Sequence, residues 1–393
     1  MAMDETPGQH SKLPQVAILF AQFAAYHVDR VEAAARRLEG RAEVLAVEYA
    51  TTSAVYAWEP AEGIEHARHV TLFPGQSYHD LGKMERYRAA KKALAGADMV
   101  CVGVPYSRPD IIALSWRLAA AGKRMVLMTE SKFDDFPRRL AREQAKAKLL
   151  SPYKAAIVGA SRQRDYLQFL GFGDKPIVPG YDTVGLDRIR EQGGGETVRW
   201  KDRDFLFVGR FVAKKNLNVL LAAYARYREL AGAAARRLVL AGDGELADDL
   251  KAQAGEGVEF TGFLKAEEVS QRLARALALC LVSTEEQWGL VVNEAAAFGV
   301  PSIVSQAVGS RDALVRNGVS GYVVEPQSIE SIARAMLALS QSEQAWQRYS
   351  DATAERAHLG DTERFADAVE ALFDPTSEGA SRAVKFWQEI SEG

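Results

Sequence analysis

The chain has 393 residues, enough for two or three domains of roughly 150 residues each. With 48% apolar and 26% charged residues, its composition is typical of a soluble globular protein and excludes a disordered or collagen-like chain. The formal net charge of −3 argues against a dedicated nucleic-acid binder, which would carry a strongly basic domain.

Cysteine content and hydropathy indicate the cellular compartment in which the protein is expected. Cys101 and Cys280 are the two cysteines, and both lie in apolar segments, which predicts buried, inert thiols in a reducing compartment and excludes a disulfide framework. No apolar run reaches the ~18–20 residues of a membrane span, and the N-terminal residues have no signal-peptide core. We therefore expect a cytoplasmic protein, and peripheral contact with the cytoplasmic membrane face stays open.

The first half of the chain alternates short β-branched runs with amphipathic segments, a pattern typical of a parallel sheet covered by helices. After a disordered tail over residues 1–13, we expect a Rossmann-like acceptor-binding domain over residues 14–190. Its predicted strands are Val16–Phe20, Ala42–Glu48, Met99–Val104, Arg124–Thr129 and Ala155–Val158, and its predicted helices include Val28–Leu38, Glu85–Ala95 and Asp110–Ala121.

A change of pattern divides the chain. Residues Arg188–Arg203 contain three consecutive glycines, many charges and no periodicity, so we predict a linker over 191–203. A second Rossmann-like domain is expected over 204–375, with a helix over 376–393 that returns to the first domain. Its predicted strands are Phe205–Val208, Leu238–Ala241, Val258–Thr261, Leu277–Val282, Ser302–Ser305 and Tyr322–Val324. Open parallel sheets bind ligands beyond their carboxyl ends, so two such α/β domains predict an active site in the cleft between them.

The most informative segment is Ser283–Ser305, in which a strand leads through a turn into a helix. Glu286 precedes the turn at Gly289, and Glu294 follows eight residues after Glu286, inside the helix. Both carboxylates can face a ligand near free backbone N–H groups. The alternative is a pair of solvated acids at a helix start.

Two cations follow the first strand of the second domain. Arg210 and Lys215 lie between the strand and a helix that opens at Asn216, a suitable place to bind a diphosphate, although solvated surface cations are the alternative. Further along, Gly242–Ala247 matches the G-x-G-x-x-A dinucleotide fingerprint. The next strand does not end in the acidic residue that would bind a ribose, which argues against a nicotinamide cofactor.

Together these segments resemble the signature of glycosyltransferase family four, over most of Phe205–Leu337. Gln287 and Trp288 stand where the family usually has glycine and phenylalanine, and Asn216 replaces a usual glycine. The resemblance implies a GT-B fold and retaining transfer that needs no metal and no cofactor besides a nucleoside-diphosphate sugar. Arg210, Lys215 and Glu286 inherit the catalytic roles. Donor-binding roles fall to Gly209, Gly242, Gly244, Gly262, Phe263, Leu264, Trp288, Gly289, Leu290 and Glu294.

Candidates in the first domain are fewer. Tyr26 and His27 follow the first strand and are candidate acceptor or sugar contacts, with a locally bonded helix-start residue as the alternative for His27. Glu130 ends a strand where many family members carry a cleft histidine, and so inherits a sugar or acceptor contact. Two basic stretches form either solvated helix faces or a patch for an anionic membrane or lipid-linked acceptor: Lys83, Arg86, Arg88, Lys91 and Lys92, then Arg138, Arg139, Arg142, Lys146 and Lys148.

The hypothesis is therefore a retaining glycosyltransferase that moves a hexose from a UDP- or GDP-sugar to a saccharide or lipid-linked acceptor. Synthesis of cell-surface polysaccharides or glycoconjugates would use such an activity. A nucleotide-sugar epimerase or a phosphorylase on the same fold is the enzymatic alternative. A scaffold without catalysis, which binds a membrane or a protein partner, is the alternative from another class.

Overall fold

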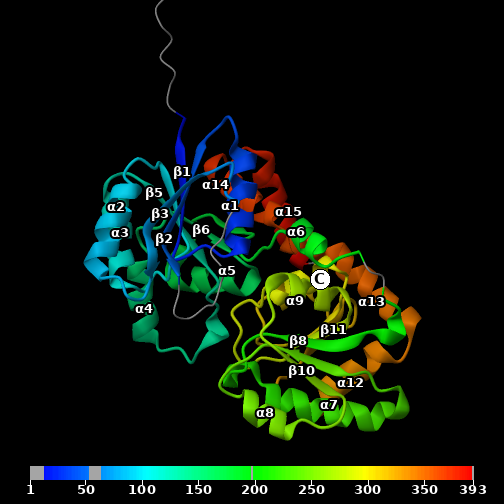
Figure 1. Cartoon of the computed structure of the whole chain (residues 1–393). Coiled ribbons are helices and arrows are strands. Elements are labelled where there is room, and N and C mark those ends of the chain that lie inside the picture. Colours follow the sequence, from blue (N-terminus) through cyan, green and yellow to red (C-terminus); the bar gives the residue numbers. More distant parts are fainter. Residues whose placement is uncertain (1–12, 53–62, 196–197, 392–393) are drawn as a thin grey trace, which may run out of the picture. The chain divides into compact units, whose positions relative to one another are not determined.

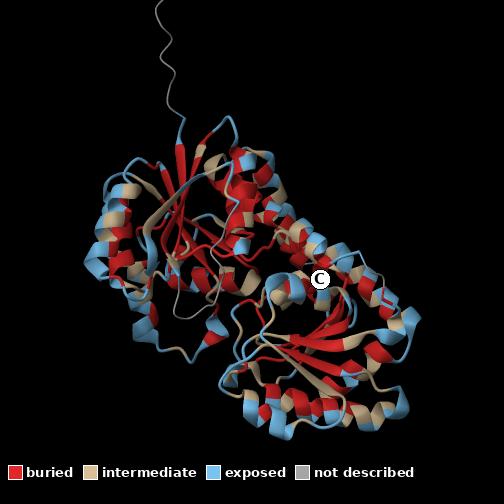
Figure 2. Cartoon of the chain, in the orientation of Figure 1, coloured by how far each residue is buried: buried red, intermediate tan, exposed pale blue. Residues whose placement is uncertain are grey.

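The computed structural model describes residues 13–52, 63–195 and 198–391 (Figure 1). It contains a seven-stranded and a six-stranded sheet, with helices between most successive strands, so the predicted α/β class with doubly wound parallel sheets is confirmed. The central strands of both sheets are the most thoroughly buried elements, whereas the helices expose their outer faces (Figure 2). This burial on both faces explains why the strands are continuous apolar runs.

The first sheet has the strand order β3-β2-β1-β4-β5-β6-β7. Its topology reverses between β1 and β4, which both pair with their neighbours in parallel. The strands are β1 Gln15–Phe20, β2 Glu43–Thr52, β3 Arg68–Ser77, β4 Met99–Val102, β5 Arg124–Thr129, β6 Ala155–Val158 and β7 Ile177–Pro179. The accompanying helices are α1 Ala25–Leu38, α2 Lys83–Ala93, α3 Pro109–Ala120, α4 Leu140–Leu149, α5 Ser161–Leu167 and α6 Leu186–Gln192.

Two edge strands and one helix depart from the sequence-based assignment. Strand β3 contains Pro74 and Gly75 and is half exposed, which an edge strand tolerates. Its sequence therefore lacks the apolar pattern from which a strand would be predicted. Strand β7 has only three residues. The predicted linker pattern over Arg188–Arg203 is wrong at its start, because α6 continues to Gln192, with Leu186 and Ile189 buried on one face. The predicted domain boundaries at 190/191, 203/204 and 375/376 stay predictions.

The second sheet has the strand order β10-β9-β8-β11-β12-β13, and its topology reverses between β8 and β11. Its strands are β8 Asp204–Val208, β9 Leu238–Ala241, β10 Val258–Gly262, β11 Ala276–Leu281, β12 Ser302–Ser305 and β13 Gly321–Val324. The helices are α7 Leu217–Ala231, α8 Ala247–Gln253, α9 Ala266–Ala274, α10 Val291–Ala297, α11 Arg311–Leu314, α12 Ile329–Ser340 and α13 Glu343–Arg356. All six predicted strands are present within one or two residues of their predicted ends.

The last two helices, α14 Thr362–Phe373 and α15 Glu378–Ser391, pack against β7 of the first sheet. Arg382 of α15 ties them together, since its Nε donates to Asp367 Oδ1 of α14 at 2.6 Å. The backbone of α14 approaches Gly180 so closely that a Cβ there would lie 2.3 Å from the Arg364 carbonyl oxygen. The C-terminal helix thus returns to the first sheet, as predicted.

The described chain forms two compact units. One extends to Leu127 and includes Pro152–Lys154, while the other comprises Met128–Ser151 and the residues from Ala155 onward. Cys101 and Cys280 are fully buried, in one unit each, and burial raises the pKa of both thiols to about 12, which confirms the prediction of inert thiols. Of the helices in the described ranges, none has the length and apolar character needed to cross a membrane.

Candidate functional site

The loops that follow β8, β9 and β10 interlock at the carboxyl edge of the second sheet. Gly209 N donates to Ala241 O at 3.0 Å, and Gly242 N donates to Gly262 O at 2.9 Å. Gly242 has a φ of 141°, and a Cβ at this position would lie 1.9 Å from the Gly209 carbonyl oxygen. Only glycine permits this approach. The structure therefore brings the predicted donor-binding glycines together, with Gly244 packed in the same way against the backbone of Phe211.

Lys215 and Glu286 form an ion pair between the two loops that diverge at the topological switch of this sheet. Lys215 follows β8, Glu286 follows β11, and Lys215 Nζ contacts Glu286 Oε2. Their side chains are 15% and 13% exposed, so the pair is partly buried. Ser283, which is fully buried, donates from Oγ to the same Glu286 oxygen at 3.1 Å. Because ligands of open α/β sheets bind at such switch points, this ion pair marks the candidate site.

Asn216 explains how the chain turns from Lys215 into helix α7. Its φ of 61° and ψ of 33° are left-handed, and it is the single non-glycine residue with positive φ in the described ranges. Asparagine is one of the few residue types that visits this region. Its Nδ2 donates to Val282 O at 3.0 Å and to Pro326 O at 2.7 Å, which joins the turn to two further loops. The usual family glycine is thus replaced by a residue that keeps the conformation and adds two hydrogen bonds.

The remaining predicted donor contacts differ in exposure. Arg210 is exposed immediately after Gly209, and Phe263 is 67% exposed after β10, while Leu264 packs against the core. Trp288 is only 3% exposed, and its ring lies beside Gly159 inside the core, so the structure does not place the ring where a donor sugar could reach it. Within this loop, the backbone of Gly289 and Leu290 remains the candidate for a donor contact.

Sequence reasoning missed the residue that anchors this loop. Asn293 of α10 is fully buried; its Oδ1 accepts a hydrogen bond from Trp288 Nε1 at 2.9 Å. Its Nδ2 donates to Asp182 O at 2.8 Å and to Gly360 O at 3.1 Å. An asparagine in a helix that is otherwise rich in alanine is the one sequence signal that could have suggested this role. Ser283 likewise gave no motif signal.

Glu294 lies in the first turn of α10. Burial raises the pKa of its carboxyl above the ordinary value, and the positive charge of Arg188 on α6 offsets part of that increase. The neutral form is thus favoured more than for an exposed glutamate. The two oxygens of the carboxyl can accept hydrogen bonds from the two hydroxyls of a diol.

The candidates in the first sheet have local roles. His27 Nδ1 accepts a hydrogen bond from Ala24 N at 3.0 Å, and its ring packs 4.1 Å from that of Phe20. Burial, together with the charge of Arg30, holds the pKa of His27 well below the ordinary value. The local bond is the alternative that the sequence left open. Tyr26 is half buried with Arg30 stacked on its ring, and Glu130 is half buried directly after β5.

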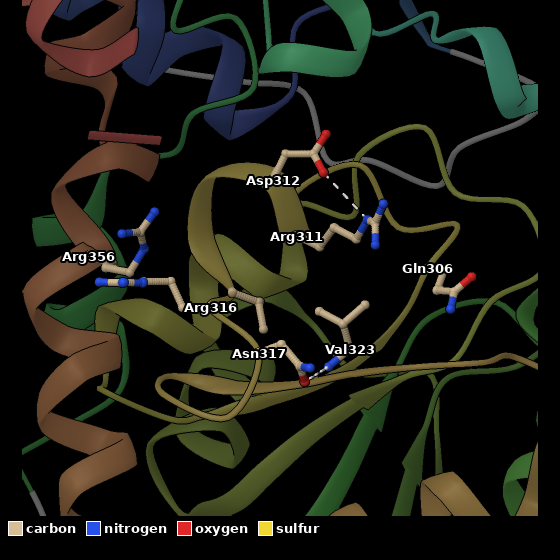
Figure 3. Close-up of a pocket in the computed structure, with 8 residues that line it drawn as sticks. Gln306, Arg311, Asp312, Arg316, Asn317, Val323 and Arg356 are labelled. Carbon is tan, nitrogen blue, oxygen red and sulfur yellow. Dashed lines mark hydrogen bonds and ion pairs between the residues drawn. The ribbon is translucent and has the colours of Figure 1, made fainter. Parts of the chain in front are cut away.

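A separate cavity of about 440 Å³ lies near α11, β13 and α13 (Figure 3). Arg311 points toward Asp312 on one side of α11, whereas Arg316 and Arg356 lie together on the other side (Figure 3). Arg356 donates from Nε and Nη2 to Ala313 O. None of the predicted site residues lines this cavity. In the described ranges, no group of three or more histidine, cysteine, aspartate or glutamate side chains is arranged to bind a metal.

Residues 192–356 match the family described as glycosyl transferases group 1. This segment is a group 1 glycosyltransferase domain. It contains Arg210, Lys215, Glu286 and Glu294, whereas Tyr26, His27 and Glu130 lie outside it.

Curated relatives match less than half of the chain. The chain is 31% identical over 177 residues to the glycogen synthase of Mycobacterium tuberculosis, an alignment that covers 44% of this chain and 42% of that protein. It is 28% identical over 192 residues to the O-antigen chain mannosyltransferase C of Escherichia coli, which covers 46% of this chain and 49% of the relative. The chain therefore spans less than half the length of these relatives.

Solved structures match nearly the whole chain. The sucrose-phosphate synthase of Thermosynechococcus elongatus superposes with a TM-score of 0.70 at 18% identity, covering 92% of this chain and 98% of that one. Anabaena HepE in complex with UDP and glucose gives a TM-score of 0.67 at 15% identity, covering 92% and 100%. These similarities establish the GT-B fold for the group 1 glycosyltransferase domain and the sheet that precedes it.

Proposed function

We propose that this chain is a retaining, metal-independent hexosyltransferase that uses a UDP- or GDP-sugar and acts on a saccharide or lipid-linked acceptor. The observation that carries the proposal is the Lys215–Glu286 ion pair at the topological switch of the group 1 domain. The complexes of HepE with UDP and with UDP-glucose support a nucleotide donor. The glycogen synthase and mannosyltransferase relatives support a hexose and a place in polysaccharide or glycoconjugate synthesis.

The chemistry follows from where charge develops. When the bond between the sugar C1 and the diphosphate oxygen breaks, negative charge grows on that oxygen, and Arg210 and Lys215 stabilise it. Glu286 hydrogen-bonds the donor sugar and favours its positive character. Backbone N–H groups of Gly289 and Leu290 supply further donors to the phosphate. The acceptor hydroxyl attacks C1 from the face that the diphosphate leaves and transfers its proton to the departing phosphate oxygen, which retains the anomeric configuration.

Recognition of the nucleoside uses the remaining candidates. Glu294 holds the ribose hydroxyls, and exposed Phe263 stands beside the interlocked glycine loops where a base would stack. Tyr26, His27 and Glu130 stay candidate contacts of sugar or acceptor, although His27 Nδ1 already accepts a hydrogen bond from Ala24 N.

A thermal-shift and calorimetric screen against UDP, GDP, ADP, dTDP and their common sugars, with and without Mg²⁺, tests the proposal. A ligand at 100 times its Kd adds about 2.7 kcal/mol to the free energy of unfolding. We expect a Mg²⁺-independent shift with one nucleotide that Arg210→Ala abolishes. Arg334→Ala, on the exposed face of α12, is the matched control and should leave it intact.

The product then separates transfer from the alternatives. Release of nucleoside diphosphate that depends on an added acceptor, with retained anomeric configuration by NMR, supports the proposal. Release that requires inorganic phosphate indicates a phosphorylase, and conversion of the donor sugar without an acceptor indicates an epimerase. If no nucleotide shifts a well-folded sample, the proposal is wrong and a non-catalytic scaffold replaces it.

A further inference from the structure

The segment from η1 (Phe133–Asp135) through α4 exposes several large apolar side chains. Phe133, Phe136 and Leu140 are 49%, 57% and 68% exposed, and Phe169, two residues after the end of α5, is 54% exposed. The rings of Phe133 and Phe169 meet edge to face with centroids 5.3 Å apart. Monomeric proteins rarely leave such neighbouring large apolar groups in water without a partner. We call Phe133, Phe136, Leu140, Phe169 and the exposed cations Arg139, Arg142 and Lys148 the α4 patch.

The backbone that carries Phe133 is fixed by contacts of Arg138. Arg138 Nε donates to Phe133 O at 2.7 Å, and its guanidinium lies 4.4 Å above the ring of Tyr166. Tyr166 is itself buried and hydrogen-bonded to Glu143. The backbone that presents the α4 patch is therefore anchored to α5.

Charges of opposite sign are segregated in the same segment. Glu143 is buried and bound to Lys146, Asp135 is buried and bound to Lys132, and Asp134 is paired with Arg162. Three cations of the same segment, Arg139, Arg142 and Lys148, are instead exposed. The segment thus exposes both cations and large apolar side chains, although the whole chain carries a net charge of −3.

We infer that the α4 patch docks the protein on an anionic lipid bilayer, with the phenylalanine and leucine side chains in the headgroup region and the cations against lipid phosphates. Partly buried apolar groups flanked by arginine and lysine are the combination that binds this surface. The structure also shows that some cations of the two basic stretches predicted from the sequence are buried or paired. Arg86 of α2 is buried against Asp110 of α3, and Arg138 and Lys146 are engaged as described. Of the two basic stretches, the one in the segment from η1 through α4 is therefore the one that combines exposed cations with several exposed apolar residues.

The inference deepens the proposed function, because a lipid-linked acceptor would lie in the same bilayer. Its test uses the full chain and flotation with vesicles of phosphatidylcholine alone or mixed with phosphatidylglycerol. We expect tighter binding to the mixed vesicles. Phe136→Ser with Leu140→Ser should weaken that binding about tenfold or more, since each loses a partly inserted apolar side chain. Arg139→Gln with Arg142→Gln should weaken it by about fivefold per cation.

A matched control comes from α2. Lys91→Gln with Lys92→Gln removes two exposed cations from a helix with one large exposed apolar residue, Met84, and should change binding less than about twofold. Equal binding to both vesicle types, an unchanged Phe136/Leu140 variant, or an equal effect of the α2 control would overturn the inference. Loss of self-association in that variant, measured by sedimentation without lipid, would show instead that a second copy covers the patch. Nucleotide-induced thermal shifts in every variant report separately on the proposed function.

Discussion

The Lys215–Glu286 ion pair makes a quantitative prediction about stability. Lys215→Met leaves the Glu286 carboxylate, 13% exposed, with the Ser283 hydroxyl as its donor, and Glu286→Gln leaves Lys215 without its counter-charge. Removing one partner of a fully buried pair costs about 3–5 kcal/mol, and an exposed pair contributes at most about 1 kcal/mol. Because these side chains are about one seventh exposed, the cost lies between these two limits, and we expect each single variant to lower the free energy of unfolding by about 2 kcal/mol. The double variant should lose little more than either single one.

The assay is a double-mutant cycle measured by urea unfolding with tryptophan fluorescence. We expect a coupling free energy of about 1–3 kcal/mol. The exposed pair Arg226–Glu330, with an N–O distance of 3.1 Å, is the matched control and should couple more weakly than Lys215 and Glu286. A coupling free energy between Lys215 and Glu286 that is no larger than that of the control pair would refute the prediction that the ion pair forms in solution. In the activity assay, each single variant should also lower kcat about 10²-fold or more while it stays folded.

Three further predictions concern neighbouring elements. Asn216→Ala should destabilise the protein by about 2–4 kcal/mol in urea unfolding, and Asn216→Gly by about 1 kcal/mol less, because glycine relieves the left-handed strain but not the lost hydrogen bonds; equal losses would contradict the strain argument. His27 has a lowered pKa in the folded state, so the free energy of unfolding is highest above pH 6.5 and falls as the pH drops below it. From pH 7.5 to 5.5 the wild type should lose on the order of 1 kcal/mol more than His27→Gln, whose amide oxygen can keep the bond to Ala24 N. Parallel pH profiles of the two proteins would disprove it. Gly242→Ala should abolish the nucleotide-induced thermal shift, because its methyl group would displace Gly209, whereas Gly255→Ala, in open space, should not.

The fold was largely predictable because its central strands are buried on both faces. Strands such as β1 and β11 are continuous apolar runs between helical patterns, and the sequence carries that signal locally. Edge strand β3 is half exposed and contains Pro74, so its pattern resembles a loop. Its pairing with β2 is a long-range contact that no local pattern contains.

Candidate site residues could be predicted from the sequence where ligand chemistry requires a particular residue type. They could not be predicted where tertiary packing decides what a side chain contacts. Lys215 and Glu286 were predicted because cations and carboxylates beyond strand ends suit ligand binding and because their segments resemble the family signature, and the structure adds that the two side chains form an ion pair. Asn293 was missed because its role depends on Asp182 O and Gly360 O, which are more than 60 residues away in sequence. Trp288 was predicted as a donor contact, yet an aromatic residue in a turn carries no local signal of the side to which its ring points. Its burial depends on Gly159 in a different sheet.

The same ion pair also constrains how a donor could bind. Lys215 is neutralised by Glu286 before any diphosphate arrives, so a diphosphate has to share or take over this cation. Glu286 is kept in place meanwhile by Ser283, whose carbonyl oxygen accepts a hydrogen bond from the fully buried Ser305 Oγ. A carboxylate held in this way does not need to move when Lys215 turns toward the phosphate. A charge that is already in place adds no reorganisation energy to the activation barrier. We therefore expect the two serines to matter for kcat more than for donor affinity, since they position Glu286 without contacting the nucleotide.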